Sequence, residues 1–374
     1  MKIIIIGTVA ASFYGFRAEL IRTLIKNRHQ VYAYTTDYRE EDLVKIKQLG
    51  ANPIPYKLSR GGLNPFKDIY STLLLAKSIK TIEPDVVFSY FSKPVIFGTL
   101  AAKLAKTPKV IGMLEGLGYV FTDQPQGIDI KTSIIKKLQV TLYRISLPRL
   151  DTFILLNHDD PIDLLDKYNI KINNIEVLGG IGLDLKKYPL TPIPKLPVNF
   201  IFIARLLKEK GIFEFIEAAK KVKQQYPSTK FTVLGAIDWE NPGALKQYEL
   251  DKLIELNLVE YPGHVDNIQS WIASSHVFVL PSYREGLPRS TQEAMAMGRP
   301  VITTDVPGCR ETAVNGLNGF IVERWNSKAL EEKMIYFIEN PDQIEKMGLE
   351  SYKMAQKKFD AEKTNQKLLK ILGL

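Results

Sequence analysis

The feature that most constrains the fold is the alternation of short apolar runs with longer amphipathic stretches along the whole chain. The apolar run 3–6 and the amphipathic stretches 19–27 and 69–82 are typical members of the two kinds. Short apolar runs predict buried strands, and apolar residues at helical spacing predict helices. Strands that alternate with helices form parallel sheets covered on both faces, so the chain is expected to be an α/β protein.

The predicted strands fall into two sets. In the first half they are residues 2–7, 31–36, 85–90, 109–113, 151–157 and 174–178. In the second half they are residues 198–204, 230–234, 259–261, 277–280, 301–304 and 320–322.

A length of 374 residues suits two domains better than one. Four prolines between 189 and 197 remove backbone donors and favour an extended linker. We therefore predict domains 1–188 and 189–374, with the last helix able to pack back on the first domain. Each is expected to be a doubly wound, Rossmann-like parallel sheet. Ligands of such sheets bind beyond the carboxyl ends of the strands, so two facing domains would enclose a cleft.

Charge is unevenly distributed. Residues 1–150 hold 22 Lys/Arg and 11 Asp/Glu, whereas the remainder holds 28 and 30. A basic first half favours a partner with negative charge, such as nucleic acid, anionic lipid or a phosphorylated substrate. Solubility alone would also account for it.

Composition excludes several classes of protein. The single cysteine, Cys309, cannot form a disulfide framework and fits a cytoplasmic compartment. The four histidines lack metal-ligand spacing, so no metal site is expected. No apolar run approaches the roughly 18 residues of a membrane span, so any membrane contact is expected to be peripheral.

The passage after the strand 277–280 is the most informative. It turns at Gly286 and then opens a helix, with Pro288 near the first helical position. The first turn of a helix presents unpaired N–H groups and a positive dipole end, which together favour a bound diphosphate. Ser290 adds a hydroxyl donor there.

Two glutamates flank this helix start. Glu285 precedes it and Glu293 lies one to two turns inside it, so each is placed to accept from ligand hydroxyls. A surface glutamate and a helix N-terminal charge would also explain this pair. Arg205 ends the strand 198–204 and offers a planar guanidinium fork to phosphate oxygens. Lys210, at the start of the next helix, offers them a mobile point charge. A solvated basic turn is the alternative.

Together these residues resemble the family 4 retaining glycosyltransferases, which have the two-domain GT-B fold. The resemblance covers nearly the whole chain and is strongest over 198–323. It implies that Arg205 and Lys210 bind the diphosphate, that Glu285 holds the donor sugar and that Glu293 holds the ribose. In the loop 261–266, backbone contacts from His264 or Val265 would read uracil; His264 would otherwise cap a turn. The nucleotide-sugar-binding set is then Arg205, Lys210, His264, Val265, Glu285, Gly286, Leu287, Pro288, Ser290 and Glu293.

Three further passages, 115–121, 180–184 and 305–312, resemble a narrower group. Its members extend undecaprenyl-diphosphate-linked glycans and include N-acetylgalactosaminyltransferases and capsule and O-antigen transferases. Many relatives place a histidine near the acceptor where this chain has Glu115.

The N-terminal loop 7–17 lacks the GxGxxG spacing of a dinucleotide site. We interpret it as lining the acceptor side, although an ordinary strand-to-helix turn would look the same. The acceptor-binding residues predicted here and after Glu115 are Ser12, Phe13, Arg17, Gly116 and Tyr119, with Arg17 meeting the acceptor's phosphate. In the stretch 133–149, apolar residues at helical spacing lie beside lysines and arginines, which suits an anionic membrane surface or core packing.

The resemblance implies retaining transfer of a hexose or N-acetylhexosamine from a UDP-sugar to an undecaprenyl-diphosphate-linked saccharide. The catalytic residues would be Glu115, Arg205, Lys210 and Glu285. Neither a cofactor nor a metal is expected, and nucleic acid is not an expected partner. The enzyme would lie in the cytoplasm, at the cytoplasmic face of the inner membrane. A UDP-sugar epimerase or hydrolase of the same fold, or a non-catalytic basic peripheral membrane protein, remains the alternative.

Overall fold

A computed structural model describes residues 1–58, 65–239, 241 and 243–374. Its contacts divide the chain into two compact units. Unit 1 is Met1–Leu117, Ile130–Gly182 and Ala361–Leu374, and unit 2 is Gly118–Asp129 and Leu183–Asp360. These bounds differ from a single division after Tyr188, because the segment 118–129 groups with unit 2 and the segment 361–374 groups with unit 1.

Unit 1 contains a sheet of parallel strands in the order β3-β2-β1-β4-β5-β6-β7. The strands are β1 (Lys2–Ile6), β2 (Gln30–Thr35), β3 (Asn52–Pro55), β4 (Val86–Tyr90), β5 (Lys109–Met113), β6 (Thr152–Leu155) and β7 (Ile175–Val177). The central strands are fully buried because helices cover both faces.

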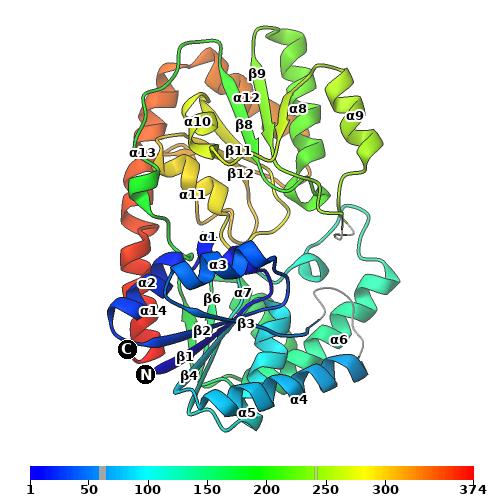
Figure 1. Cartoon of the computed structure of the whole chain (residues 1–374). Coiled ribbons are helices and arrows are strands. Elements are labelled where there is room, and N and C mark those ends of the chain that lie inside the picture. Colours follow the sequence, from blue (N-terminus) through cyan, green and yellow to red (C-terminus); the bar gives the residue numbers. More distant parts are fainter. Residues whose placement is uncertain (59–64, 240, 242) are drawn as a thin grey trace. The chain divides into compact units, whose positions relative to one another are not determined.

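The helices of unit 1 lie on two sides of this sheet. They are α1 (Ala10–Gly15), α2 (Ala18–Lys26), α3 (Glu40–Gln48), α4 (Pro65–Ile82), α5 (Thr99–Leu104), α6 (Ile130–Ser146), α7 (Asp159–Pro161) and α14 (Ala361–Leu372). The chain steps from β1 to β3 in one direction and from β4 to β7 in the other. Right-handed crossovers then put α2 and α3 on one face and α4, α5 and α6 on the other (Figure 1).

Strand β3 is absent from the sequence prediction. It has the sequence Asn-Pro-Ile-Pro, and prolines argue against a strand because they cannot donate to a ladder. β3 lies at the edge of the sheet and pairs only with β2 among the described strands, so Pro53 and Pro55 are tolerated there. The twelve predicted strands are all present within two residues of their expected bounds.

Unit 2 repeats the architecture, with parallel strands in the order β10-β9-β8-β11-β12-β13. The strands are β8 (Asn199–Ile203), β9 (Lys230–Leu234), β10 (Glu260–Gly263), β11 (Val277–Leu280), β12 (Val301–Thr304) and β13 (Gly319–Val322). The helices are α8 (Ile212–Gln225), α9 (Gln247–Glu255), α10 (Ile268–Ala273), α11 (Arg289–Ala296), α12 (Ser327–Glu339) and α13 (Asp342–Lys358). The two sheets confirm the predicted fold class of two doubly wound parallel α/β units.

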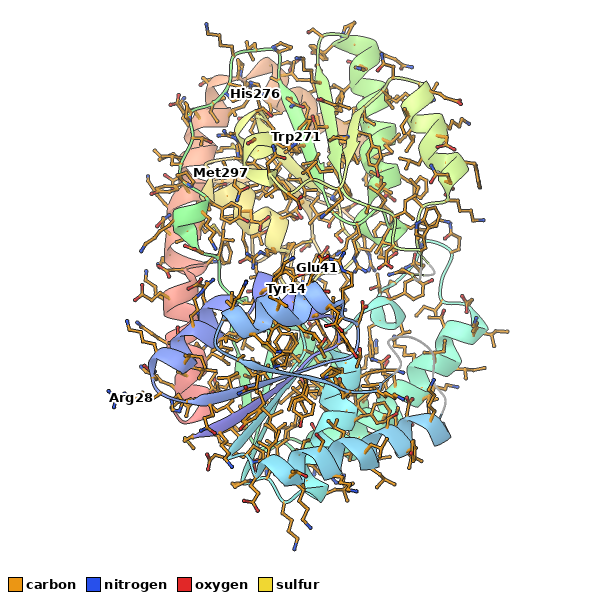
Figure 2. The ribbon with its side chains drawn as sticks, in the orientation of Figure 1. Tyr14, Arg28, Glu41, Trp271, His276 and Met297 are labelled. Atoms are coloured by element: carbon orange, nitrogen blue, oxygen red, sulfur yellow. The ribbon has the colours of Figure 1, made fainter. Side chains whose placement is uncertain are left out.

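Two buried side chains hold the amino-terminal edge of this second sheet. Arg299 is fully buried and donates to the carbonyl oxygens of Thr191, Pro192 and Ile272, so it ties the proline-rich segment to the core of unit 2. His276, labelled in Figure 2, accepts a hydrogen bond of 3.0 Å from the backbone N–H of Asn199. Both groups satisfy backbone polar atoms that burial would otherwise leave unpaired.

Each sheet has a point where the strand order reverses. In unit 1 it lies between β1 and β4, and in unit 2 between β8 and β11. Loops that leave the carboxyl ends of such neighbouring strands separate from one another and leave room for a ligand. The N-terminal loop of unit 1 follows β1, and the loops that carry Arg205, Lys210 and Glu285 in unit 2 follow β8 and β11. Glu115 instead follows β5, and His264 follows β10. In the part of the chain that the structure describes, none of the helices has the length and apolarity needed to cross a bilayer.

Candidate functional site

The turn after β8 carries both predicted phosphate-binding cations of unit 2. Arg205 follows the strand, and Lys210 ends a short 3-10 turn, Lys208–Lys210. Gly211 comes next with a φ of 76°, and a Cβ there would collide with the carbonyl oxygen of Pro281. A glycine is therefore required for this turn to lie against the loop that follows β11.

Lys210 and Glu285 meet across these two loops. The Lys210 ammonium forms an ion pair with Glu285 Oε1, and the Ser282 hydroxyl donates to the same oxygen at 2.8 Å. Both partners are mostly buried, yet each keeps some exposure, 17% for the lysine side chain and 11% for the glutamate. The two residues predicted to act on the diphosphate and the donor sugar are thus in direct contact.

A third loop supports Glu285 from behind. The backbone N–H of Glu285 donates to the carbonyl of Pro307 at 3.0 Å. Gly308, with a φ of 76°, packs so closely that a Cβ would collide with the carbonyl oxygens of Glu285 and Gly286. The loop after β12 therefore fixes where the Glu285 carboxylate lies.

Glu209 is a buried member of this site that the sequence prediction missed. Its carbonyl oxygen accepts from the Tyr283 N–H at 2.8 Å and from the Ser282 hydroxyl at 2.9 Å. Burial raises the pKa of the Glu209 carboxyl, and its Oε2 is buried without a hydrogen-bond partner. The only sequence signal was an acidic residue between Lys208 and Lys210, which reads as ordinary charge balance.

The start of α11 is open to a ligand at its backbone. Pro288 is the N-cap residue, and no side chain caps the helix, so nothing of that kind occupies the first N–H groups. Gly286, Leu287 and Pro288 are buried beneath this end, whereas Ser290 is half-buried on the first turn. The arrangement agrees with the predicted diphosphate seat.

Glu293 lies on the second turn of α11 and is already paired. It accepts from the Tyr188 hydroxyl at 2.8 Å and from Arg289 Nε at 2.9 Å. Burial is the main cause that raises the pKa of Tyr188, and the adjacent carboxylate adds to it. The predicted ribose-binding glutamate therefore has a fixed position and a compensating cation.

Arg205 is more accessible than Lys210. Its side chain is 53% exposed and forms an ion pair with Asp238 in the loop after β9. The loop after β10 lies beside it: Tyr261 donates to the carbonyl of Gly235 at 2.8 Å, and the N–H of Gly235 donates to Gly263 at 2.9 Å. His264, the next residue, is exposed, and Val265 is half-buried. Both remain available at this edge of unit 2.

The predicted acceptor residues of unit 1 form a different kind of cluster. Arg17 is only 2% exposed and forms an ion pair with Glu115, which is 17% exposed. Its guanidinium lies 4.8 Å from the centre of the Tyr90 ring. The expectation that Arg17 meets an acceptor phosphate stays a prediction; in this structure the guanidinium is enclosed and paired with Glu115.

Ser12 and Phe13 are also interior residues. The Ser12 hydroxyl lies 2.6 Å from the Tyr90 hydroxyl, and the Phe13 ring packs edge-on against Tyr90 at 5.7 Å. Both are buried in this structure, so their predicted part in an acceptor surface stays a prediction. Gly116 is half-buried with a φ of 129°. Tyr119 is half-buried too, and it belongs to the segment 118–129 that groups with unit 2.

Among the described residues, no group of three or more His, Cys, Asp or Glu side chains is arranged to hold a metal ion. The charges of the site are those of its own lysine, arginine and glutamate side chains and of the α11 amides.

Comparison with known proteins adds independent evidence. The family model described as glycosyl transferases group 1 matches residues 191–354, and that described as glycosyl transferase 4-like matches residues 2–156. A Campylobacter jejuni protein, N,N'-diacetylbacillosaminyl-diphospho-undecaprenol alpha-1,3-N-acetylgalactosaminyltransferase, is 31% identical over 91% of this chain and 90% of its own. The capsular polysaccharide biosynthesis glycosyltransferase CapM of Staphylococcus aureus is 28% identical over 96% and 94%.

Solved structures show that the fold is shared. Anabaena Alr3699/HepE in complex with UDP and glucose has a TM-score of 0.77 at 17% identity, covering 100% of this chain and 99% of that protein. A glycosyltransferase from Rickettsia africae has a TM-score of 0.77 at 19% identity, covering 99% and 97%.

Proposed function

We propose that this chain, which belongs to the group 1 glycosyl transferases, moves a sugar from a UDP-sugar donor to a saccharide linked to undecaprenyl diphosphate. The observation that carries the proposal is the Lys210–Glu285 ion pair beside the uncapped start of α11. It unites a cation for phosphate, a carboxylate for sugar hydroxyls and a helix start without a side-chain cap at one end of the unit 2 sheet.

Departure of UDP is the step that these groups would assist. Negative charge accumulates on the leaving diphosphate as the bond to the sugar breaks, so fixed positive groups lower the barrier. Lys210, Arg205 and the α11 amides supply them. In this scheme Glu285 holds the donor sugar, Glu293 the ribose, and backbone groups of His264 or Val265 the uracil.

Retention at the anomeric carbon is part of the proposal. The acceptor hydroxyl would attack from the face that UDP leaves, and a donor phosphate oxygen would take its proton. No strong side-chain base and no bound metal is needed, because the stabilising charge belongs to the protein. Glu115 of unit 1 would orient the attacking hydroxyl.

The acceptor class rests on the relatives. The Campylobacter jejuni protein is named for a diphospho-undecaprenol acceptor, and an Escherichia coli protein, 27% identical over 69% of this chain, for a diphosphoundecaprenol one. Because the relatives are named as transferases, an epimerase, a hydrolase or a non-catalytic binding protein is not favoured.

The test is UDP release by the full chain with a panel of donors: the UDP derivatives of N-acetylgalactosamine, N-acetylglucosamine, galactose and glucose. A short polyprenyl-diphosphate glycan serves as acceptor. We expect one donor to release UDP only when the acceptor is present, with a product larger by one sugar. Donor consumption without acceptor would instead indicate a hydrolase or epimerase, and no UDP affinity would refute the donor site.

Peripheral association with an anionic membrane, on its cytoplasmic side, completes the proposal. Helix α6 exposes apolar side chains on one stripe, with Ile130 81% exposed and Ile134 and Leu138 following at four-residue intervals. Lys131 and Lys137 flank this stripe and are exposed as well. An apolar stripe bordered by lysines suits the interface of an anionic bilayer.

A vesicle sedimentation assay tests this surface. The chain should pellet with phosphatidylglycerol vesicles and much less with phosphatidylcholine vesicles, and Ile134→Asp should reduce pelleting. Leu256→Asp, at an exposed apolar position of unit 2, is the matched control and should leave it unchanged. Equal pelleting of the parent and Ile134→Asp would exclude α6 as the contact.

A further inference from the structure

Arg17 of unit 1 is enclosed and paired with Glu115, and its place in the sheet indicates what it does. Arg17 lies between α1 and α2, beyond the carboxyl end of β1, and Glu115 lies beyond the end of β5. The strand between β1 and β5 in the sheet is β4, whose last residue is Tyr90. Arg17 therefore reaches across the end of β4, over the Tyr90 ring, to meet Glu115.

The support beneath Arg17 is rigid. Tyr90 is fully buried, its hydroxyl pairs with Ser12 at 2.6 Å, and Phe13 packs against its ring. The Arg17 backbone N–H donates to the Ser12 carbonyl at 3.1 Å. Arg17 Nε is buried without a hydrogen-bond partner, so the Glu115 ion pair and the ring face are the contacts that compensate its charge.

Burying a cation this completely is costly unless it is paired. A surface ion pair would stabilise the fold without that cost, so stability alone explains the arrangement poorly. The arrangement does give Glu115 a fixed position beside a cation while leaving part of its side chain exposed. Groups that act on a substrate gain from such a supporting layer, because small displacements lower the rate strongly.

We propose that Arg17 is a positioning residue that holds Glu115 ionised and in place, so that Glu115 accepts a hydrogen bond from the attacking hydroxyl of the acceptor. Ser12, Phe13 and Tyr90 form the platform on which Arg17 rests. This inference rests on the proposed transfer and assigns the three buried residues of the N-terminal loop a role through Glu115 rather than through the acceptor.

Arg17 and Tyr90 are titratable groups that face Glu115. Burial raises the pKa of Tyr90, and Arg17 opposes that shift, so the tyrosine stays neutral throughout the useful pH range. Removing the guanidinium would take the Arg17 charge away from the Glu115 carboxylate. Loss of an adjacent opposite charge raises the pKa of a carboxyl by about 1–3 units.

The experiment is a double-mutant cycle of Arg17→Met and Glu115→Gln in the full chain. It measures kcat and the acceptor KM against pH, with the donor that supports transfer and the polyprenyl-diphosphate glycan. Each single variant should lose on the order of 10²-fold in kcat. The double variant should be no slower than Glu115→Gln alone, because Arg17 acts only through that carboxylate.

The pH profile separates positioning from simple structural support. In Arg17→Met the acidic limb of kcat should move upward by about 1–3 pH units, and in Glu115→Gln that limb should vanish. Arg17→Lys keeps the charge and should recover most of the rate, which preserves the test if Arg17→Met folds poorly. Arg22→Met, which removes an exposed ion pair with Glu19 on the same helix, is the control and should match the parent.

Three results would each overturn the inference while leaving the proposed transfer intact. The first is that Arg17→Met lowers kcat equally with Glu115 and with Gln at position 115. The others are an acidic limb of the kcat profile that does not move in Arg17→Met, and full activity in Glu115→Gln. Absence of acceptor-dependent transfer by the parent chain would contradict both.

Discussion

The two units use the same topology but treat their cations in opposite ways. In unit 2, Arg205 and Lys210 are paired with carboxylates yet remain accessible, so a diphosphate has a route to them. In unit 1, Arg17 is almost fully enclosed and meets a single carboxylate. We infer that a cation which binds a ligand keeps part of its side chain exposed, 53% for Arg205 and 17% for Lys210, whereas a cation which fixes a neighbour, such as Arg17 at 2%, is almost fully buried.

Among the tests of this contrast, the substitution Lys210→Ala is expected to have the largest effect. Losing one fixed electrostatic stabiliser lowers kcat by on the order of 10²–10³-fold, and the unit 2 cations are expected to behave in this way. UDP release with acceptor measures it. Lys208→Ala removes an exposed lysine from the same turn and should change the rate little. A near-parent rate for Lys210→Ala would remove the distinction between the two units.

His276 lies away from both candidate sites and is expected to affect the free energy of unfolding. The change should be comparable in kcal/mol to the loss of transition-state stabilisation expected for Lys210→Ala. Burial lowers the pKa of His276 to about 4, whereas an unfolded histidine has a pKa of about 6.5. Between these pH values the unfolded chain binds a proton that the folded chain does not, so the free energy of unfolding falls as pH falls. The loss should reach about 3 kcal/mol at pH 4 and be absent above pH 7.

Urea unfolding between pH 4 and 8 measures this loss. His276→Gln should flatten the dependence in that window without altering kcat at pH 7.5. If the free energy of unfolding of His276→Gln still falls as pH falls through this window, other buried groups cause the acid instability. The result also marks the pH below which rate profiles of Arg17 variants report on unfolding.

Gly308→Ala should have an intermediate effect on turnover. The added Cβ displaces the backbone of Glu285 and Gly286, so kcat should fall by roughly 10- to 10²-fold. Gly316→Ala is the matched control, because Gly316 has a φ of 77° and open space around it. Both substitutions introduce backbone strain of about 1–2 kcal/mol, and only the first should slow transfer. Equal kinetics in the two variants would show that the loop after β12 does not position Glu285.

The smallest effect concerns the exposed ion pair of unit 2. If Asp238 competes with the diphosphate for Arg205, Asp238→Asn should tighten UDP binding by up to about fivefold, the scale of an exposed ion pair. Isothermal titration calorimetry at low and high salt measures the change, which should shrink as salt rises. Asp342→Asn breaks an exposed pair on α13 and serves as the control. Weaker binding would instead mean that Asp238 orients Arg205.

The sequence sufficed for residues whose role is set by their position at a strand end. Arg205 and Lys210 lie in the loop after β8, Glu285 lies in the loop after β11, and Glu293 lies on the helix that this second loop enters. Their placement near the carboxyl edge of a parallel sheet was therefore predictable. Their partners were not. Tyr188 and Glu293 are 105 residues apart and Lys210 and Glu285 are 75 apart, and no local pattern specifies such pairs.

Burial was the other quantity that local patterns misjudged. An arginine before a helix is usually exposed, so Arg17 was read as a ligand-binding residue, and Ser12 and Phe13 with it. The enclosure comes from Tyr90 on a strand more than 70 residues later. Strand β3 was missed for a comparable reason, because only its edge position makes its prolines acceptable.

Helix α14 has a consequence for how the protein is made. It belongs to unit 1 and contacts α2, with Leu368, Leu369 and Leu372 buried, although all of unit 2 is synthesised between these two helices. The apolar surface of unit 1 that α14 covers therefore stays exposed during translation until α14 has left the ribosome. Chaperone capture of nascent chains should persist late into translation, and shortening α14 should damage the unit that is translated first.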